Sequence, residues 1–462
     1  MNPTLSVTPW REVADQKQVR LRSLAREFQR RFGRAPQVFV LAPGRVNLIG
    51  EHTDYNGYPV LPAALDREVA VAAAGRPDDQ VVAHTMAPGF GPCAFSLAEP
   101  LCPGIQGDWG NYVKAAANVP LARSLRQGAD LLIDSTVPSG AGLSSSSALV
   151  VGVGLALLAC GGAAEGSRIA LAEEFAAAEH FVGTMSGGMD QACCLLGQSG
   201  CALRIDFFPL RVRSVPFLPD YRIVVCHSLV TAEKAASVRR AYNLRVWECG
   251  IAARALKVLL RGDADAVVER LADVERLIGA PSRRDLLAML ADYIPDRPLS
   301  VIQLAGMLRV SPAKLLPPIE PPPVSLETPL PILRRTRHVL READRVDAAE
   351  RALIKHNVSA LDEAMRTSHA SCRDDYEVSC DELEVLVGLS AQAGAIGPRL
   401  TGAGFGGCTV QLVPEKQVPE FFRWIDQHFY LERLPSGSLP ASYRFAFEPA
   451  DGAQVVWCED RL

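Results

Sequence analysis

The sequence lacks the features that mark several large classes of protein. Its 462 residues carry a formal net charge of −4, which provides no strong positive field to attract nucleic acid or an anionic membrane. No charged leader followed by an apolar core is visible among the first residues, and the longest apolar run, Ala148 to Cys160, is too short to span a bilayer. We therefore expect no nucleic-acid partner, no membrane partner and a cytoplasmic location.

Recognisable disulfide and metal patterns are also missing. The twelve cysteines include no CxxC spacing, and the eight histidines form no HExxH motif. Scattered cysteines in a chain without a secretory signal are typical of reduced, mostly buried thiols. We expect neither a disulfide framework nor a zinc ion held entirely by protein side chains.

What the sequence does contain is the composition of an ordinary globular protein. It is 48% hydrophobic and 22% charged, and it is long enough for two domains, or for one domain and an insertion. Hydrophobic periodicity and glycine–proline punctuation predict mixed helices and strands without an internal repeat. The expected helices are 10–33, one within 107–125, 148–160 and 332–370, and the expected strands are 37–42, 68–74, 80–84, 130–134 and 221–226. The arginines and glutamates of 332–370 are expected on a solvated face.

The most informative stretch is GRVNLIGEHTDYNG, residues 44–57, which follows an apolar run. Arg45, Glu51, His52 and Asp54 offer charged and hydrogen-bonding groups that are close enough in sequence to converge on one small polyhydroxylated molecule. A capped turn would explain residues 54–57 alone, because Asp, Asn and Gly are ordinary turn residues, but it would not explain Arg45 and the Glu–His pair. A sugar is the ligand that we expect.

A loop rich in glycine and serine, TVPSGAGLSSSSAL at 136–149, lies between an expected strand and an apolar helix. Gly140 and Gly142 allow backbone amides to approach an anion, the serines add hydroxyl donors, and the positive end of the following helix faces the loop. This pattern predicts a phosphate-binding loop, although not a Walker A loop, because the Gly-Lys-Ser/Thr ending is absent. A flexible linker would explain the serines, but not their position between a strand and a long apolar helix.

Two carboxylates further along the chain are candidates for chemistry. Asp190 follows two glycines and precedes an apolar segment, so a helix N-cap is the ordinary interpretation of this residue taken alone. Glu179 falls on a preceding predicted helix, where a glutamate is usually solvated. The residues by themselves leave these simple structural roles open.

Taken together and in this order, these strings and a fourth, RLTGAGFGGCTVQLV at 399–413, resemble the motifs of the galactokinase branch of the GHMP sugar and metabolite kinases. The resemblance covers nearly the full chain and is closest to the long galactokinase and N-acetylgalactosamine kinase group. It implies an α+β fold of two domains, 1–215 and 216–462, with the active site in the cleft between them. It also implies a mainly helical insertion at about 258–331, for which a helix-turn-helix at 298–315 is a weaker interpretation because basic residues are sparse there.

The resemblance further implies roles for particular residues. Asp190 corresponds to the catalytic base, and Arg45 would stabilise this carboxylate and the migrating phosphoryl group. The sugar would be bound by Arg45, Glu51, His52, Asp54, Asp190 and Tyr242, the last of these from a YNxR-like segment. ATP would be bound by Gly140, Gly142, Ser144, Ser145 and Lys234, and Mg²⁺ by Ser145 and Glu179.

Three hypotheses about function follow from this resemblance. The first is a galactokinase, which makes galactose 1-phosphate from ATP and galactose. The second is an N-acetylgalactosamine kinase, because the insertion and the small Gly188 near Asp190 are compatible with a bulkier sugar. The third is a sugar sensor without catalysis, which is disfavoured because Asp190 and the serine loop are intact. We expect a monomer with no additional cofactor.

Overall fold

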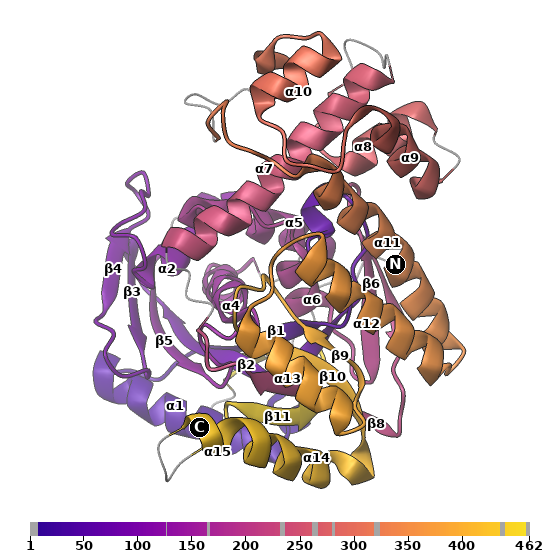
Figure 1. Ribbon diagram of the computed structural model, residues 1–462. Coiled ribbons are helices and arrows are strands. Elements are labelled where there is room, and N and C mark those ends of the chain that lie inside the picture. The colour runs from indigo at the N-terminus through magenta and orange to yellow at the C-terminus, as the bar shows by residue number, and fades with distance from the viewer. Residues whose placement is uncertain are drawn as a thin grey trace.

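Two main β-sheets, the helices packed against them and a helical insertion make up the molecule (Figure 1). The computed structural model describes residues 8–125, 127–163, 167–231, 236–260, 267–279, 282–317, 324–434 and 439–458. Helices and mainly antiparallel strands occur together throughout this part of the chain. The predicted α+β class is confirmed.

The first sheet has six strands in the order β12-β1-β2-β5-β3-β4, all antiparallel neighbours except the parallel pair β3 and β5. Its strands are β1 (Val38–Asn47), β2 (Pro62–Gly75), β3 (Gln80–Thr85), β4 (Cys93–Ser96), β5 (Ala129–Ser135) and β12 (Gln454–Trp457). They confirm the strands predicted in this region. β1 continues beyond its expected end into GRVNLIGEHTDYNG, residues 44–57, which we call the first motif. Its register with β2 shifts between Pro43 and Arg45. Such an irregularity redirects a side chain, here that of Arg45.

The second sheet has four strands in the order β11-β8-β10-β9, and β6 and β7 form a separate antiparallel ribbon. These strands are β6 (Cys201–Asp206), β7 (Arg211–Pro216), β8 (Tyr221–His227), β9 (Ile396–Leu400), β10 (Cys408–Pro414) and β11 (Arg444–Phe447). The strand predicted at 221–226 is confirmed as β8. The motif RLTGAGFGGCTVQLV at 399–413 is called the last motif below. Its glycines connect β9 to β10, so two paired strands fix both ends of that loop.

Different helices cover the two faces of the first sheet. In β1, Phe39 belongs to the apolar cluster that includes α1 (Asp15–Phe32), whereas the adjacent Val40 belongs to the main core with α4 (Ser145–Cys160). This alternation is expected of a strand, in which successive side chains point to opposite faces. α4 is apolar on all sides and is buried along most of its length. The sheet therefore fixes the position of α4, whose N-terminus follows the loop rich in glycine and serine, called the serine loop below.

The other helices of the body surround these layers (Figure 1). They are α2 (Gly110–Ala117), α3 (Pro120–Leu125), α5 (Arg168–Glu179), α6 (Met189–Leu196), α7 (Ala236–Leu259), α11 (Ile332–Ile354), α12 (Val358–Asp374), α13 (Asp381–Gln392), α14 (Val418–Ile425) and α15 (Leu431–Arg433). Shorter turns are η1 (Trp10–Glu12), η2 (Asp54–Asn56), η3 (His180–Val182), η5 (Glu415–Gln417) and the π-helical η6 (Asp426–Tyr430). The helices predicted within 10–33, 107–125 and 148–160 are confirmed.

The segment predicted to be helical at 332–370 is confirmed as helical and forms two helices, α11 and α12. His356, between them, has a positive φ of 50°. The side chain of Asn357 then caps α12 by accepting a hydrogen bond from Ala360 N at 3.1 Å. The periodic pattern did not reveal this break because the apolar spacing resumes immediately after it.

The prediction that the charged residues of 332–370 face solvent is wrong for three of them. Arg335, Glu342 and Glu350 of α11 are buried. Arg335 is ion-paired with Glu248 of α7 at 2.7 Å, Glu342 with Arg345 at 2.7 Å, and Glu350 with Arg213 at 2.7 Å. Burial of these charges is tolerated because each has a partner of opposite charge.

The helical insertion extends from one end of the molecule, at the top of Figure 1. It contains α8 (Leu271–Ile278), α9 (Arg283–Tyr293), α10 (Val301–Leu308) and the short turn η4 (Pro312–Lys314). These helices share an apolar core with α7 and α11, which anchors the insertion to the body. Within the described residues α10 is followed by η4 and not by a second α-helix, which does not match a helix-turn-helix.

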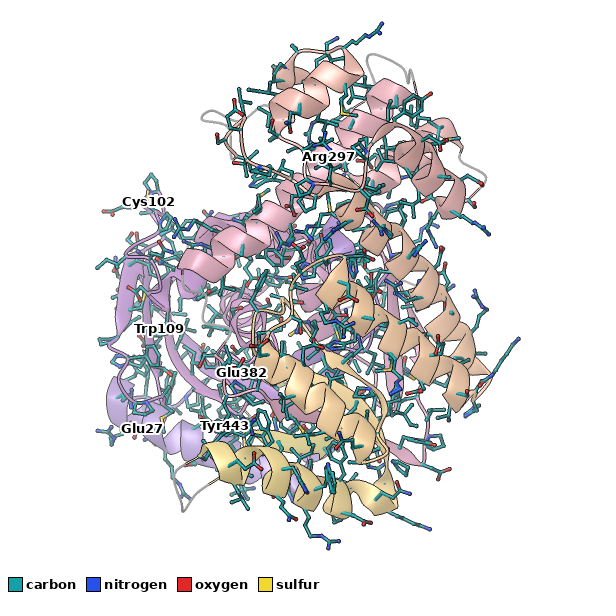
Figure 2. All side chains as sticks on the ribbon, viewed as in Figure 1. Glu27, Cys102, Trp109, Arg297, Glu382 and Tyr443 are labelled. Carbon is teal, nitrogen blue, oxygen red and sulfur yellow. The ribbon has the colours of Figure 1, made fainter. Side chains whose placement is uncertain are left out.

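The cysteines are all free thiols. Six of the twelve are buried, five are partly buried, and Cys102 is exposed on the loop between β4 and α2 (Figure 2). Among the helices described, none is both long and apolar enough to cross a membrane.

Candidate active site

A cavity of about 160 Å³ lies where the glycine-rich motifs meet. Segments that are far apart in the sequence contribute to its lining, from the first motif to the last. Every predicted site residue that the structure describes lines it, namely Arg45, Glu51, His52, Asp54, Gly140, Gly142, Ser144, Ser145, Glu179, Asp190 and Tyr242. Lys234 lies outside the described residues. The structure therefore brings all the other predicted residues together.

Arg45 and Asp190 form an ion pair in the wall of this cavity. The guanidinium donates from Nε to Asp190 Oδ1 and from Nη1 to the carbonyl oxygen of Gly142, each at 2.7 Å, and its Nη2 lies 2.7 Å from the same Oδ1. Asp190 is the second residue of α6, which begins directly after Gly188. Burial opposes the charge on Arg45, but the adjacent carboxylate outweighs this effect and raises the pKa of Arg45. A permanent positive charge is thereby held beside Asp190.

Serine hydroxyls connect the loop at 136–149 to both carboxylates. Ser144 Oγ donates to Asp190 Oδ2. Ser147 Oγ donates to Glu179 Oε2 at 2.8 Å and lies 3.4 Å from Asp190 Oδ2. Ser147 was not predicted as a site residue, although its position three residues after Ser144 places both hydroxyls on one face of the helix start.

Ser144 is also unusual in its backbone. It has a left-handed φ of 64° and immediately precedes α4. For a non-glycine residue this conformation is costly and persists where the surrounding structure fixes it, which is common at functional sites. His52, in the first motif, has a similar φ of 62°.

Asp54 is held against the loop that precedes α6. Gly187 N donates to Asp54 Oδ2 at 3.1 Å. A Cβ atom at position 187 would overlap the backbone of Asp54 and Tyr55, so this close approach requires glycine. Burial raises the pKa of Asp54 to about 6; the charge on Asp190 adds to this shift, and backbone N–H groups oppose it.

A chain of hydrogen bonds fixes His52. Its Nε2 lies 3.2 Å from the carbonyl oxygen of Ala403, which can accept but not donate, so Nε2 carries the proton. Burial lowers the pKa of His52 to about 3, so the ring is neutral and Nδ1 accepts from the hydroxyl of Tyr55 at 2.9 Å. The Tyr55 oxygen accepts in turn from the hydroxyl of Tyr376 at 2.7 Å. The ring of Tyr242 packs on the same imidazole, with the centroids 5.4 Å apart.

Glu51 lines the cavity and also belongs to a buried charge network. It is ion-paired with Arg399, and its Oε1 accepts a hydrogen bond from Gly402 N at 3.1 Å. Burial raises the pKa of Glu51, and Arg399 and the Gly402 amide oppose the shift. Arg399 also lies 3.8 Å from Glu342, whose Oε1 accepts from Gly50 N at 2.9 Å. Neither Arg399 nor Glu342 was predicted as a site residue from the sequence.

The serine loop and the last glycine-rich motif touch each other and the first motif. Arg45 N donates to the carbonyl oxygen of Leu143 at 3.2 Å, and Asn47 N donates to Thr401 Oγ1 at 3.0 Å. A Cβ atom on Gly402 would lie 2.6 Å from the carbonyl oxygen of Gly142. The last motif therefore needs glycine at this point in order to pack against the serine loop.

A second hollow of about 330 Å³ adjoins the first cavity. The two share Thr184 and Arg239 in their linings. The other walls of the hollow are formed by the loop at 103–108, by α2, where Asn111 and Tyr112 lie, and by residues 181–183. These residues were not predicted as part of a site, because a short loop followed by a small helix carries no distinctive motif.

The cavity also offers a partial set of metal ligands. No group of three or more His, Cys, Asp or Glu side chains in the described ranges is placed to hold a metal ion. Mg²⁺, however, usually binds through one or two carboxylates and takes its other ligands from phosphates and water. Glu179 and Ser145 line the same cavity, so the oxygen donors present fit such a shared site.

Three family descriptions match this chain in succession. The galactokinase galactose-binding signature matches residues 26–75, the GHMP kinases N terminal domain matches 111–198, and the GHMP kinases C terminal domain matches 349–430. The first range includes the first motif, the second includes the serine loop and Asp190, and the third includes the last motif.

Curated relatives match over most of their length. The galactokinase of Chloroflexus aggregans is 40% identical over 405 residues, which cover 85% of this chain and 88% of the relative. The galactokinase of Dictyostelium discoideum is 32% identical over 466 residues, which cover 92% of this chain and 91% of the relative.

Solved structures agree with these matches. The galactokinase of Lactococcus lactis, solved in complex with galactose, has a TM-score of 0.75 and 28% identity and covers 95% of this chain and 100% of its own. The mevalonate kinase of Methanococcus jannaschii matches with a TM-score of 0.55 and 15% identity, and the match covers 92% of this chain and 100% of its own. At this low identity the match shows only that the two proteins have the same fold.

Proposed function

The chain belongs to the galactokinase family of the GHMP kinases, and on this basis we propose that it transfers the γ-phosphoryl group of ATP to the anomeric hydroxyl of galactose. The products are galactose 1-phosphate and ADP. One observation supports this proposal most strongly. The Arg45–Asp190 ion pair and the serine loop lie in the same cavity, which is also lined by the first motif.

The sugar binds on the side of the cavity formed by residues 44–57. The carboxylates of Glu51 and Asp54 accept hydrogen bonds from its hydroxyls, and the ring of Tyr242 packs beside it. Both ring nitrogens of His52 are already engaged by protein groups, so its ring rather than its nitrogens meets the sugar. These contacts direct the anomeric hydroxyl towards Asp190.

Asp190 acts as the general base and Arg45 as the electrostatic stabiliser. As the bond between the sugar oxygen and the γ-phosphorus forms, the bond from that phosphorus to the β–γ bridging oxygen breaks. The hydroxyl proton passes to the Asp190 carboxylate late in this step, because a loose transition state needs little early deprotonation. The Arg45 guanidinium, fixed by Gly142 O and Asp190, offsets the negative charge on the migrating group.

The ATP phosphates bind at the loop that contains Gly140, Gly142, Ser144 and Ser145. The N-terminus of α4 follows this loop, and its free N–H groups and positive dipole end favour an anion. The adjoining 330 Å³ hollow then receives the nucleoside end of ATP, because the two spaces share Thr184 and Arg239. Lys234 is retained as a predicted ATP ligand.

Glu179 and the hydroxyl of Ser145 are the proposed protein ligands of Mg²⁺. When bound there, the ion would neutralise charge on the β- and γ-phosphate oxygens. The hydrogen bond from Ser147 to Glu179 fixes the orientation of that carboxylate.

A coupled assay of ADP release, with galactose and N-acetylgalactosamine side by side, tests this function. We expect ADP formation with galactose and a kcat/KM for galactose that exceeds that for N-acetylgalactosamine. A higher kcat/KM for N-acetylgalactosamine would contradict the proposed substrate. Thermal stabilisation by sugar and ATP without any ADP formation would contradict catalysis and support a sensor.

A further inference from the structure

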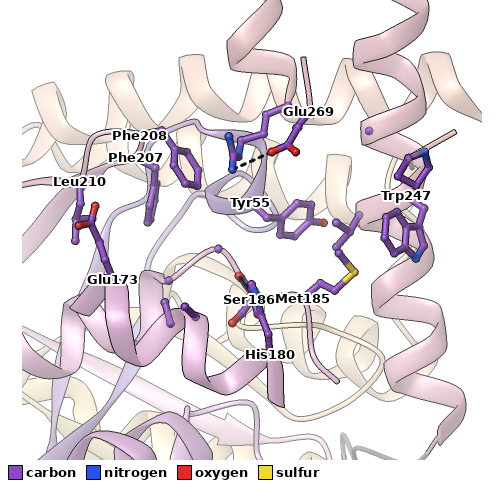
Figure 3. Close-up of a pocket in the computed structure, with 18 of the residues that line it drawn as sticks. Tyr55, Glu173, His180, Met185, Ser186, Phe207, Phe208, Leu210, Trp247 and Glu269 are labelled. Carbon is purple, nitrogen blue, oxygen red and sulfur yellow. Dashed lines mark hydrogen bonds and ion pairs between the residues drawn. The ribbon is translucent and has the colours of Figure 1, made fainter. Parts of the chain in front are cut away.

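A larger cavity, of about 510 Å³, adjoins the proposed sugar site, and Ser186 lines both spaces. Figure 3 shows this larger cavity. It is enclosed by α5, the loop at 180–188, the loop after β6, α7 and the segment that leads into α8. Its volume is within the range of small-molecule binding sites. None of the residues to which we assign catalysis or substrate binding lines it.

The lining favours a planar aromatic ligand. Four aromatic side chains face this cavity, namely Tyr55, Phe207, Phe208 and Trp247 (Figure 3). They come from the first motif, the loop after β6 and α7. Aromatic walls on several sides bind a flat ring through large contact areas and offset or edge-on packing.

The wall formed by α7 and the segment before α8 contains two arginines, and the carboxylates of Glu173 and Glu269 also line the cavity. Arg270 stacks over the ring of Phe208, with its guanidinium carbon 3.6 Å from the ring centre, and pairs with Glu269 at 3.5 Å (Figure 3). It also pairs with Asp273 at 3.6 Å. Arg254 donates instead to the uncharged carbonyl oxygen of Gly250 at 3.1 Å. Burial lowers the pKa of Arg254, and the charge of Glu269 offsets this shift only in part. An anionic group on a ligand would complete the compensation of Arg254.

Two hydrogen bonds pass from the walls of this cavity directly to predicted sugar-binding residues. Tyr55, whose ring faces the cavity, donates to His52 Nδ1 at 2.9 Å. Gly187, which also lines it, donates from its backbone to Asp54 Oδ2 at 3.1 Å. Gly187 and Gly188 then lead into the first turn of α6, which carries Asp190. A molecule in the cavity therefore contacts the groups that position the sugar ligands.

We propose that this cavity binds a small planar aromatic acid and that its binding strengthens the sugar site. Consecutive glycines have more conformational freedom to lose than other residues, so a ligand that packs against 187–188 orders them before the sugar arrives. The sugar then binds with a smaller entropic cost, which is positive coupling between two sites. The coupling rests on the proposed function, whereas the binding of the acid does not.

Calorimetric titration with two matched probes tests the binding. The probes are 2-naphthoate and 2-naphthamide, which share the ring and differ in charge. We expect naphthoate to bind about fivefold more tightly than naphthamide, the upper range for a partly exposed ion pair. Arg254→Gln should remove this preference, and Val246→Trp, which fills the cavity from α7, should abolish binding of both probes.

The controls separate cavity binding from misfolding. Both variants should keep the kcat of the unmodified protein without probe, because neither side chain belongs to the catalytic site. Equal binding of the two probes, or binding that Val246→Trp leaves unchanged, would overturn the proposed site.

The coupling is tested by titrating galactose in the absence of ATP, with and without saturating naphthoate. We expect the galactose Kd to fall at least about twofold, with the KM for ATP unchanged. A galactose Kd that stays the same or rises would overturn the coupling. If the protein fails to phosphorylate galactose at all, the proposed function fails, while the naphthoate titration still decides the proposed cavity.

Discussion

Each side chain that holds Asp190 supplies something different. Arg45 supplies a buried positive charge, Ser144 supplies a hydroxyl, and Ser147 connects the same carboxylate to Glu179. This arrangement leaves the aspartate oriented without surrounding it, because 18% of its side chain is still exposed to the cavity. In our account, its position and the neighbouring positive charge make Asp190 the base.

The hydrogen-bond chain to His52 gives a first prediction. Tyr55→Phe removes the donor to His52 Nδ1, so the imidazole is held less firmly beside the sugar. We expect the KM for galactose to rise roughly threefold to tenfold, the effect of one lost hydrogen bond, with a smaller change in kcat. Steady-state kinetics with galactose and ATP varied separately measures this.

Tyr430→Phe is a matched control for that variant. The Tyr430 hydroxyl also makes buried hydrogen bonds, to the carbonyl oxygens of His227 and Tyr443, but it lies outside the cavity. It should lower stability without changing the KM for galactose. An equal rise of this KM in both variants would contradict a specific role for Tyr55.

The raised pKa of Asp54 gives a second prediction. Burial raises its pKa to about 6, and in the proposed mechanism the ionised form accepts hydrogen bonds from the sugar. As the pH falls through 6, Asp54 gains a proton, so kcat/KM for galactose should decline on the acid side with an apparent pKa near 6. The measurement is a pH profile of kcat/KM. Asp54→Asn should lower the whole profile and remove the decline near pH 6, and any decline that is left belongs to another group such as Glu51, whose pKa burial raises to about 7. A limb that stays unchanged near pH 6 would contradict its assignment to Asp54.

At this scale the sequence predicted the polar groups but not the residues that support them. Arg45 and Asp54 could be predicted because the first motif concentrates polar groups where a simple turn would not need all of them, whereas the role of Asp190 was implied only by the resemblance to the family. Tyr376 and Arg399 could not, because their effect depends on contacts with residues more than three hundred positions away in the chain. A tyrosine or an arginine in a segment without a recognisable motif gives no local sequence pattern from which such a contact can be predicted.

At the scale of elements, the site depends on two loops that pack backbone against backbone. The serine loop precedes α4, and the last motif connects β9 to β10. Gly402 lies at their contact, where a side chain has no room beside Gly142. The positions of both loops therefore depend on the absence of a single Cβ atom.

Gly402→Ala should accordingly impair ATP use. Its φ of 79° is unfavourable for alanine, and the new Cβ would lie 2.6 Å from Gly142 O. We expect kcat/KM for ATP to fall by roughly one to two orders of magnitude, as expected when a catalytic loop shifts. Gly394→Ala is the control, since its φ is 78° but no atom lies within 4 Å of the added Cβ. Similar ATP kinetics in the two variants would contradict the importance of the loop contact.

Periodicity predicted most strands and helices but misjudged α11. Arg335, His338 and Glu342 lie at i, i+3 and i+7 and therefore on one face of that helix. This face is buried, although its residues are polar. A stripe of charged residues on a helix usually faces solvent, but this one does not. Its charges are paired with residues of another helix, such as Glu248 of α7.

At the scale of the whole molecule, buried charges connect the C-terminal helices to the first motif. Glu342 of α11 accepts from Gly50 N, pairs with Arg345, and lies near Arg399, which pairs with Glu51. β12 from the C-terminal end also pairs with β1. We propose that the two domains divide near residue 215 and that these contacts fix them relative to each other around the site.

Glu342→Gln should weaken this connection. Burial acts to raise the pKa of Glu342, but the charges of Arg345, His338 and Arg399 outweigh it and lower the pKa to about 2. The ionised group therefore stabilises the fold above pH 4.5, and this contribution is lost as the pH falls through 2. We expect a loss of roughly 3–5 kcal/mol in the free energy of unfolding at neutral pH, because buried cations lose their partner.

Chemical denaturation at several pH values measures that loss. The variant should also show a shallower decline of stability between pH 4.5 and 2. Glu363→Gln, at an exposed position of α12, is the control and should change stability little. Equal stability of Glu342→Gln and the unmodified protein would contradict the structural role of the network.

The most direct test of the account is the effect of Asp190→Asn on chemistry and on binding, measured separately. Single-turnover formation of ADP reports the chemical step, and calorimetric titration with galactose reports sugar binding. We predict that the rate falls by roughly 10²–10⁴-fold, because the proton acceptor is lost, while the galactose Kd stays within about fivefold. A rate close to that of the unmodified protein would contradict the assignment of Asp190 as the base and, with it, the proposed mechanism.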